Sequence, residues 1–148
     1  MFDPTPAPLY VSRRIPFPVD DVAGALDRLP LALCRDGTHL ALRRPTSVRY
    51  PRGPLAPTRA LPGRLRRGRV RPTFRVEVEA AAWSTEMAEL AIRPAGASCV
   101  RWPQAFLRAA VPMADHLAEL VYADALGAGA ALGVGRAEPS RAALRRAS

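Results

Sequence analysis

The sequence predicts an α+β fold in which a curved antiparallel sheet packs around one long C-terminal helix. Residues 74–80 alternate between apolar and charged side chains, which is the period of a half-buried strand. Residues 104–126 follow with apolar side chains at helical spacing, so one stripe of this helix can cover a sheet. A sheet covered in this way on one face can enclose an apolar space.

The first expected elements are a strand at residues 9–15 and a helix at residues 19–29. Asp20 and Asp21 fall in the first turn of this helix, where negative charge suits the exposed N–H groups. The apolar side chains of the helix recur at helical spacing, so the helix should bury one face.

The middle of the chain starts with a hairpin and continues into a proline-rich segment. Asp36-Gly37 stands between two apolar runs, which is a strong signal for a two-residue hairpin turn. Between Arg43 and Pro72 the chain then holds five prolines, and proline cannot donate a hydrogen bond to a sheet. We therefore expect poor regularity where the middle strands of the sheet would lie.

Two further strands precede the long helix. A strand that begins at Phe74 and a strand at residues 86–93 are separated by the turn Trp83-Ser84-Thr85. The side chains expected to face inward are Phe74, Val76, Val78, Ala80, Ala88, Leu90 and Ile92. The charged side chains of the first of these strands, expected to face water, are Arg75, Glu77 and Glu79.

The long helix at residues 104–126 should hold one apolar stripe toward the sheet. Pro112 removes one hydrogen bond from this helix, so we expect the helix to bend or restart there. Residues 127–148 lack periodicity and are expected to form a disordered tail, and residues 1–7 a flexible leader. The folded domain should therefore span residues 8–126.

Two segments of the chain carry a resemblance to a known superfamily. One is Ile15-Pro16-Phe17-Pro18-Val19-Asp20-Asp21-Val22, and the other runs from Val76-Glu77-Val78 through Trp83-Ser84 to Glu89-Leu90-Ala91-Ile92-Arg93-Pro94. Residues 8–126 thereby resemble the START-like, or SRPBCC, superfamily, which includes polyketide cyclases, Bet v 1-type allergens and lipid carriers. The resemblance implies a helix-grip fold, although residues 29–33 leave little room for the second short helix that family members usually carry.

The resemblance implies non-catalytic binding or carriage of a small hydrophobic molecule in an internal cavity. The expected lining residues are Phe74, Val76, Val78, Trp83, Leu90, Ile92, Phe106, Ala110, Met113 and Leu117. The same side chains would also suit a filled core that holds no ligand. A cyclase- or aromatase-like enzyme is a second hypothesis, because related folds do such chemistry in a pocket with few titratable groups.

The sequence gives little support to catalysis or to a bound metal or cofactor. His39 and His116 have no nucleophile or metal ligand at a recognisable spacing, so a surface or boundary position is favoured for both. Cys34 and Cys99 form no CxxC or ligand-spaced pattern. We therefore predict no catalytic residue, no metal site and no cofactor.

The positive charge is concentrated in one part of the chain. No acid lies between Asp36 and Glu77, whereas eleven arginines do, and the net charge of the whole chain is +9. Clustered arginines release counterions from phosphates, so nucleic-acid or acidic-partner binding is a third hypothesis. Its candidate contacts are Arg64, Arg66, Arg67, Arg69 and Arg71. Because no aromatic residue lies between Tyr50 and Phe74 to stack bases, a solvated hairpin is favoured and a nucleic-acid partner is not expected.

The remaining composition bears on location and origin. Lysine is absent and alanine, proline and glycine are abundant, which indicates the compositional bias of a GC-rich genome. No segment resembles a signal peptide or a membrane span, so the expected location is cytoplasmic. The identity of the ligand and the oligomeric state are left open.

Overall fold

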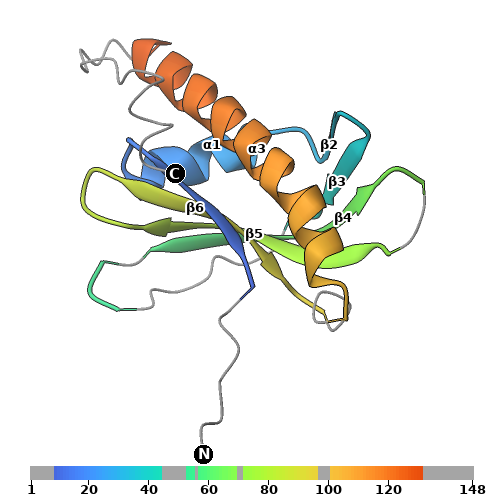
Figure 1. The fold of residues 1–148 in the computed structure, drawn as a ribbon. Coiled ribbons are helices and arrows are strands. Elements are labelled where there is room, and N and C mark those ends of the chain that lie inside the picture. Colours follow the sequence, from blue (N-terminus) through green and yellow to red (C-terminus); the bar gives the residue numbers. More distant parts are fainter. Residues whose placement is uncertain (1–8, 45–52, 56, 70–71, 97–100, 132–148) are drawn as a thin grey trace, which may run out of the picture.

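The protein folds into a curved six-stranded antiparallel sheet with a long C-terminal helix across one face (Figure 1). The computed structural model describes residues 9–44, 53–55, 57–69, 72–96 and 101–131. The elements in chain order are β1 (Val11–Ile15), α1 (Val19–Arg28), β2 (Ala32–Arg35), β3 (Thr38–Leu42), β4 (Thr58–Arg67), β5 (Phe74–Ala82), β6 (Ala88–Pro94) and α3 (Pro103–Ala131). The strand order is β1-β6-β5-β4-β3-β2. The predicted α+β fold with a curved antiparallel sheet and a long C-terminal helix is therefore confirmed.

The helix α1 follows β1 after a short connection and leads directly into β2. The carbonyl oxygen of Pro18 accepts hydrogen bonds from the N–H groups of Asp21 and Val22, at 3.0 and 3.2 Å. The N–H group of Leu29 donates to the carbonyl of Ala25 at 3.1 Å, which closes the last turn. No second helix separates α1 from β2, as the sequence predicts.

The predicted hairpin at Asp36-Gly37 joins β2 to β3. Asp36 and Gly37 have φ angles of 51° and 77°, so both central residues adopt the left-handed conformation that a type I′ turn needs. The two-residue turn places Cys34 opposite His39. The hairpin prediction is confirmed.

The expectation of poor regularity between residues 43 and 72 is wrong for the part of this segment that the structure describes. The ten-residue strand β4 lies there and pairs with both β3 and β5. The carbonyl of Pro62 accepts a hydrogen bond from the N–H group of Arg43, at 2.7 Å, just beyond the end of β3. In an antiparallel strand the nitrogen and the oxygen of one residue face the same side. The nitrogen of Pro62, which has no hydrogen to donate, therefore faces the side of β3 at a point just beyond the last residue of that strand. No hydrogen bond between β3 and β4 is lost within β3 itself.

The faces of β5 and β6 alternate as predicted, but Glu79 does not face water. The residues that point to α1 and α3 include Val78 and Leu90, and we call their side of the sheet the concave face. Glu79 points to the convex face and has only 2% of its surface exposed. Its Oε2 lies 3.4 Å from Nε of Arg93 on β6. Alternation predicts the face of a strand residue, and it does not predict whether that face is solvated.

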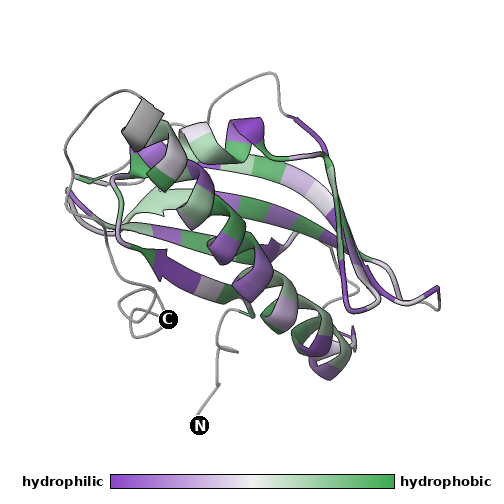
Figure 2. Ribbon diagram, turned by 90° about the horizontal axis from the view of Figure 1, so that it is seen from above, coloured by the Kyte–Doolittle hydropathy of each residue, from purple (hydrophilic) through white to green (hydrophobic). Residues whose placement is uncertain are grey.

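The helix α3 lies diagonally across the concave face, with hydrophilic residues on its outward side (Figure 2). The sequence predicts a bend or a restart at Pro112, and the helix continues through Pro112 as one element, so it does not restart there. It also extends to Ala131, beyond the expected end at Leu126, and the tail prediction for residues 132–148 lies outside the described residues. The leader predicted at residues 1–7 lies outside them too.

Two aromatic pairs fix α3 against the rest of the domain. The rings of Phe74 on β5 and Phe106 on α3 meet edge to face, with centroids 5.6 Å apart. Farther along α3, the ring of Tyr122 meets Phe17 in the same way at 5.7 Å. Such pairs add to the burial of the rings, so both halves of the helix are held in place.

Candidate functional site

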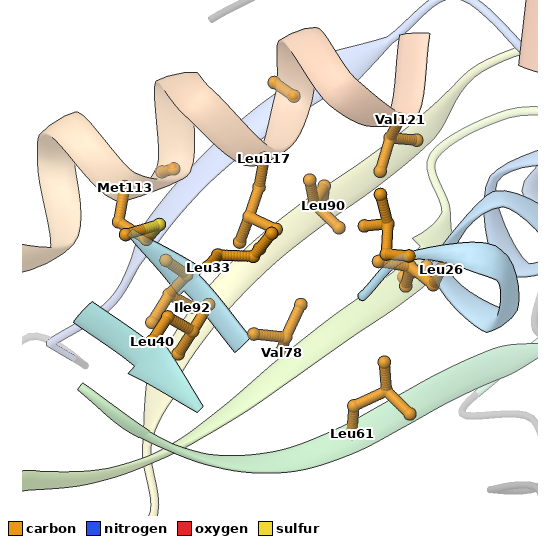
Figure 3. Close-up of a cluster of buried hydrophobic side chains, with 14 of the residues drawn as sticks. Leu26, Leu33, Leu40, Leu61, Val78, Leu90, Ile92, Met113, Leu117 and Val121 are labelled. Carbon is orange, nitrogen blue, oxygen red and sulfur yellow. The ribbon is translucent and has the colours of Figure 1, made fainter. Parts of the chain in front are cut away.

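Nine of the ten predicted lining residues come together between α3 and the concave face (Figure 3). They are Phe74, Val76, Val78, Leu90, Ile92, Phe106, Ala110, Met113 and Leu117. Each of the nine has at most 2% of its surface exposed. The sequence therefore predicted the inward residues of β5, β6 and α3, whereas the cluster also contains residues of β2, β3 and β4 that it did not name, such as Leu33, Leu40 and Leu61.

The interior formed by these nine residues is packed. A side chain that borders a space wide enough for water keeps some accessible surface, and these side chains keep almost none. Several of the neighbours on α3 are alanines, namely Ala109, Ala110, Ala114 and Ala118, which let the helix lie close to the sheet. A molecule can enter this interior only if side chains move.

Trp83 does not share this position with the other nine residues. It lies in the turn between β5 and β6, and 46% of its surface is exposed. The guanidinium carbon of Arg14 lies 3.6 Å from the centre of its ring, which is a cation–π contact at the surface. Trp83 therefore does not border the interior.

Leu33 on β2 belongs to the interior although the sequence analysis did not name it. It is the only buried residue of this four-residue edge strand. Figure 3 shows its side chain in the same apolar cluster as Leu40 and Leu117. The predicted hairpin could have indicated that Leu33 is buried, because a two-residue turn at Asp36-Gly37 places Leu33 directly opposite Leu40.

Arg35 connects the edge strand β2 to α3 beside Leu33. Its Nη1 donates to Oε2 of Glu119 at 3.0 Å and lies 3.1 Å from Nδ1 of His116. Arginine can only donate, so Nδ1 of His116 accepts, and the neutral ring carries its proton on Nε2. We call Arg35, His116 and Glu119 the rim cluster.

The surroundings of His116 favour its neutral form. Burial, followed by the positive charge of Arg35, lowers the pKa of His116, while Glu119 and Asp36 act in the opposite direction. The sequence analysis gave His116 no partner, and Arg35 lies 81 positions away in the chain, so only the folded structure brings the two together.

Cys34 and His39 form a second contact that the sequence analysis missed. The Sγ atom of Cys34 lies 4.0 Å from Nε2 of His39 on the convex face of the β2–β3 hairpin. Cys99 lies outside the described residues. Among the residues that the structure describes, no three His, Cys, Asp or Glu side chains are placed to hold a metal ion.

The candidate arginines follow the β4–β5 hairpin. Arg64, Arg66, Arg67 and Arg69 are exposed on β4 and on the turn after it, and Arg71 lies outside the described residues. Arg75 on β5 stands opposite Arg64 in the pairing of the two strands. The structure therefore adds Arg75 to the basic surface that the sequence predicted.

Comparison of the chain with known protein families, with curated proteins and with solved structures gave no match. The resemblance to START-like proteins thus rests on the pattern of residues described above. Within the described part of the chain, no helix combines the length and the apolar character that crossing a bilayer requires.

Proposed function

We propose that this chain binds a small hydrophobic molecule between α3 and the concave face of the sheet, as a non-catalytic binding or carrier protein. A short helix after the first strand and a long helix held by a curved sheet are the features that the START-like resemblance implies. The side chains that meet between the two layers are apolar, so this interior suits a ligand without charge.

The construction of β2 is the observation that carries the proposal. This edge strand has a single neighbouring strand, and Leu33 is its only buried side chain. Where β2 meets α3, the polar contacts are those of Arg35 with His116 and Glu119, and exposed ion pairs contribute little to stability. We infer that the ligand enters where Leu33 moves away from α3.

The proposal predicts that Leu33→Ala admits a neutral hydrophobic dye such as Nile red. The shorter side chain removes the apolar contact that closes the interior at the proposed entrance, so an apolar guest can pass between β2 and α3 into the apolar interior. We expect saturable, equimolar binding in a fluorescence titration and a rise of Tm with added dye, because a ligand of the folded state stabilises that state. Native mass spectrometry of the unmodified chain should show a retained small molecule.

Two variants serve as controls for this experiment. Leu31→Ala truncates a half-exposed leucine outside β2 and should leave dye binding unchanged. In the double variant Leu33→Ala with Ala110→Trp, the indole ring at position 110 of α3 should occupy the interior that the dye would enter, so dye binding should be abolished. The proposal is wrong if the unmodified chain retains no molecule and if folded Leu33→Ala binds no more dye than Leu31→Ala.

A further inference from the structure

Arginines stand directly opposite each other on the convex face of the sheet. Arg64 on β4 pairs with Arg75 on β5, and both side chains are exposed. Arg66 follows two residues along β4 on the same face, where it stands opposite His39 of β3. We call Arg64, Arg66, Arg75 and His39 the arginine surface.

Among the described residues, these arginines form no ion pair with an acid. In the part of the chain that the structure describes, the arginines that pair with acids are Arg13, Arg28, Arg35, Arg59 and Arg93. None of Arg64, Arg66 and Arg75 pairs with an acid among the described residues. Like charges directly opposite each other destabilise a sheet, so an anion that bound to both Arg64 and Arg75 would relieve their repulsion.

The backbone holds the arginine surface in a fixed geometry. Side chains two residues apart on a strand are separated by about 6.6 Å, and neighbouring strands by about 4.8 Å. The stem of Arg75 also rests over Gly96, where an added Cβ would lie 3.4 Å from its Cβ. Two of the guanidinium groups therefore come from β4 and one from the adjacent strand β5, with the imidazole of His39 on β3 beside them.

In contrast to the expectation from the sequence, we propose from the pairing of Arg64 with Arg75 that the arginine surface binds the phosphate backbone of a nucleic acid without reading its sequence. Duplex DNA offers one negative charge per about 1.7 Å of its axis, a density that suits closely spaced cations. The planar guanidinium group binds phosphate oxygens through two parallel hydrogen bonds.

Other partners fit this surface less well than a nucleic acid does. The centre of a protein interface combines arginine with aromatic and other apolar side chains, whereas the members of this surface are three arginines and a histidine. A membrane-binding surface would present aromatic side chains, but Trp83 lies at the other end of β5 and Trp102 lies beside the start of α3. With no aromatic side chain among its members to stack on bases, the arginine surface is expected to bind without sequence preference.

Fluorescence anisotropy with a short labelled duplex of mixed sequence tests the proposal on the full chain. The double variant Arg64→Gln with Arg75→Gln should weaken binding at low salt at least about tenfold. The slope of log affinity against log salt should fall by about 1.8, which is about 0.9 for each of two lost phosphate contacts. Circular dichroism and Tm confirm that the variant is folded.

The matched control is Arg101→Gln with Arg108→Gln, which removes the same charge from exposed positions at the start of α3. It should retain most of the affinity and of the salt slope. An equal loss in both double variants would show that net charge alone drives binding, and would overturn the proposal. The proposal would also be overturned if the chain did not bind the duplex at low salt, or if it bound phosphatidylserine vesicles but not the duplex.

Discussion

His116 shows how neighbours decide the chemistry of a single residue. Its ring lies on α3 and is partly buried beside Arg35. Burial lowers the pKa of His116 most, and the positive charge of Arg35 lowers it further. The hydrogen bond that Arg35 donates to Nδ1 further requires the neutral ring. His116 therefore resists protonation in the folded chain more than it does in the unfolded chain.

This difference predicts a loss of stability in mild acid. Because the pKa of His116 is lower in the folded state, the unfolded state binds the proton first as the pH falls. The contribution of neutral His116 to stability is therefore fully present only above the unfolded pKa of about 6.5. The free energy of unfolding should fall as the pH decreases from about 7.5 to about 5.5, a window around that value. Urea unfolding at a series of pH values measures the effect.

His116→Gln is the control for the acid effect, because glutamine does not titrate. The two proteins differ only at position 116, so the difference between the two pH profiles reports on His116 and on its contacts in the rim cluster. The variant should lose less stability than the unmodified chain over the same window. If both proteins lose stability equally, the neutral ring of His116 is not responsible for the acid sensitivity.

At the residue scale, the sequence predicts partners that a single turn brings together, and it fails for partners from distant elements. The hairpin at Asp36-Gly37 already implies that Leu33 faces Leu40, because only the turn length decides this pairing. The contact of His116 with Arg35 depends on where α3 crosses the sheet, and no local pattern encodes that crossing.

At the element scale, β4 shows why a count of prolines misjudged the middle of the sheet. Whether a proline disrupts a strand depends on the side to which its nitrogen points and on whether a neighbour is present there. Pro62 meets the end of β3, so the pairing of β4 with β5 is preserved. By contrast, the alternation in β5 predicted its inward face correctly, because burial on one side of a sheet has a period of two residues.

Gly63 in β4 provides a test of how closely β3 and β4 pack. A Cβ atom at this position would lie 2.8 Å from the carbonyl oxygen of Ala41 and 3.1 Å from a methyl group of Leu42. The carbonyl belongs to the backbone of β3 and cannot turn away, so Gly63→Ala should force the strands apart. We expect a loss of about 1–3 kcal/mol in the free energy of unfolding, as for an overpacked core.

Chemical denaturation of Gly63→Ala measures this loss, and Gly37→Ala separates it from other costs of replacing a glycine. Gly37 has a φ angle of 77° and no atom within 4 Å of an added Cβ, so its substitution strains the backbone without a steric contact. A Gly63→Ala variant as stable as the unmodified chain would mean that β3 and β4 can separate at this point without cost.

At the scale of the whole molecule, the sheet and α3 depend on each other. β1 pairs with β6, which brings residue 11 next to residue 92, so the sheet is complete only when the first and the last strand in the sequence meet. The apolar side chains of α1, α3 and the concave face form one cluster. With 148 residues, the chain is also within the size at which single domains usually unfold in one step.

The two tryptophans can test whether the layers unfold together, because each lies in a different layer. Trp83 lies in the β5–β6 turn and Trp102 directly before α3, and they are the only tryptophans of the chain. Trp83→Phe leaves a fluorophore that reports on the start of α3, and Trp102→Phe leaves one that reports on the sheet. Both side chains are about half exposed, so the substitutions should cost little stability.

We expect the urea midpoint from fluorescence to agree with the midpoint from far-ultraviolet circular dichroism in each of the two variants. Without α3 the concave face would expose its apolar side chains to water, and without the sheet α3 would lose the surface that its apolar stripe covers. A lower midpoint for the Trp102 signal would instead show α3 detaching first. An interior that opens in this way would admit a ligand by release of the helix, and not by movement of Leu33 on β2.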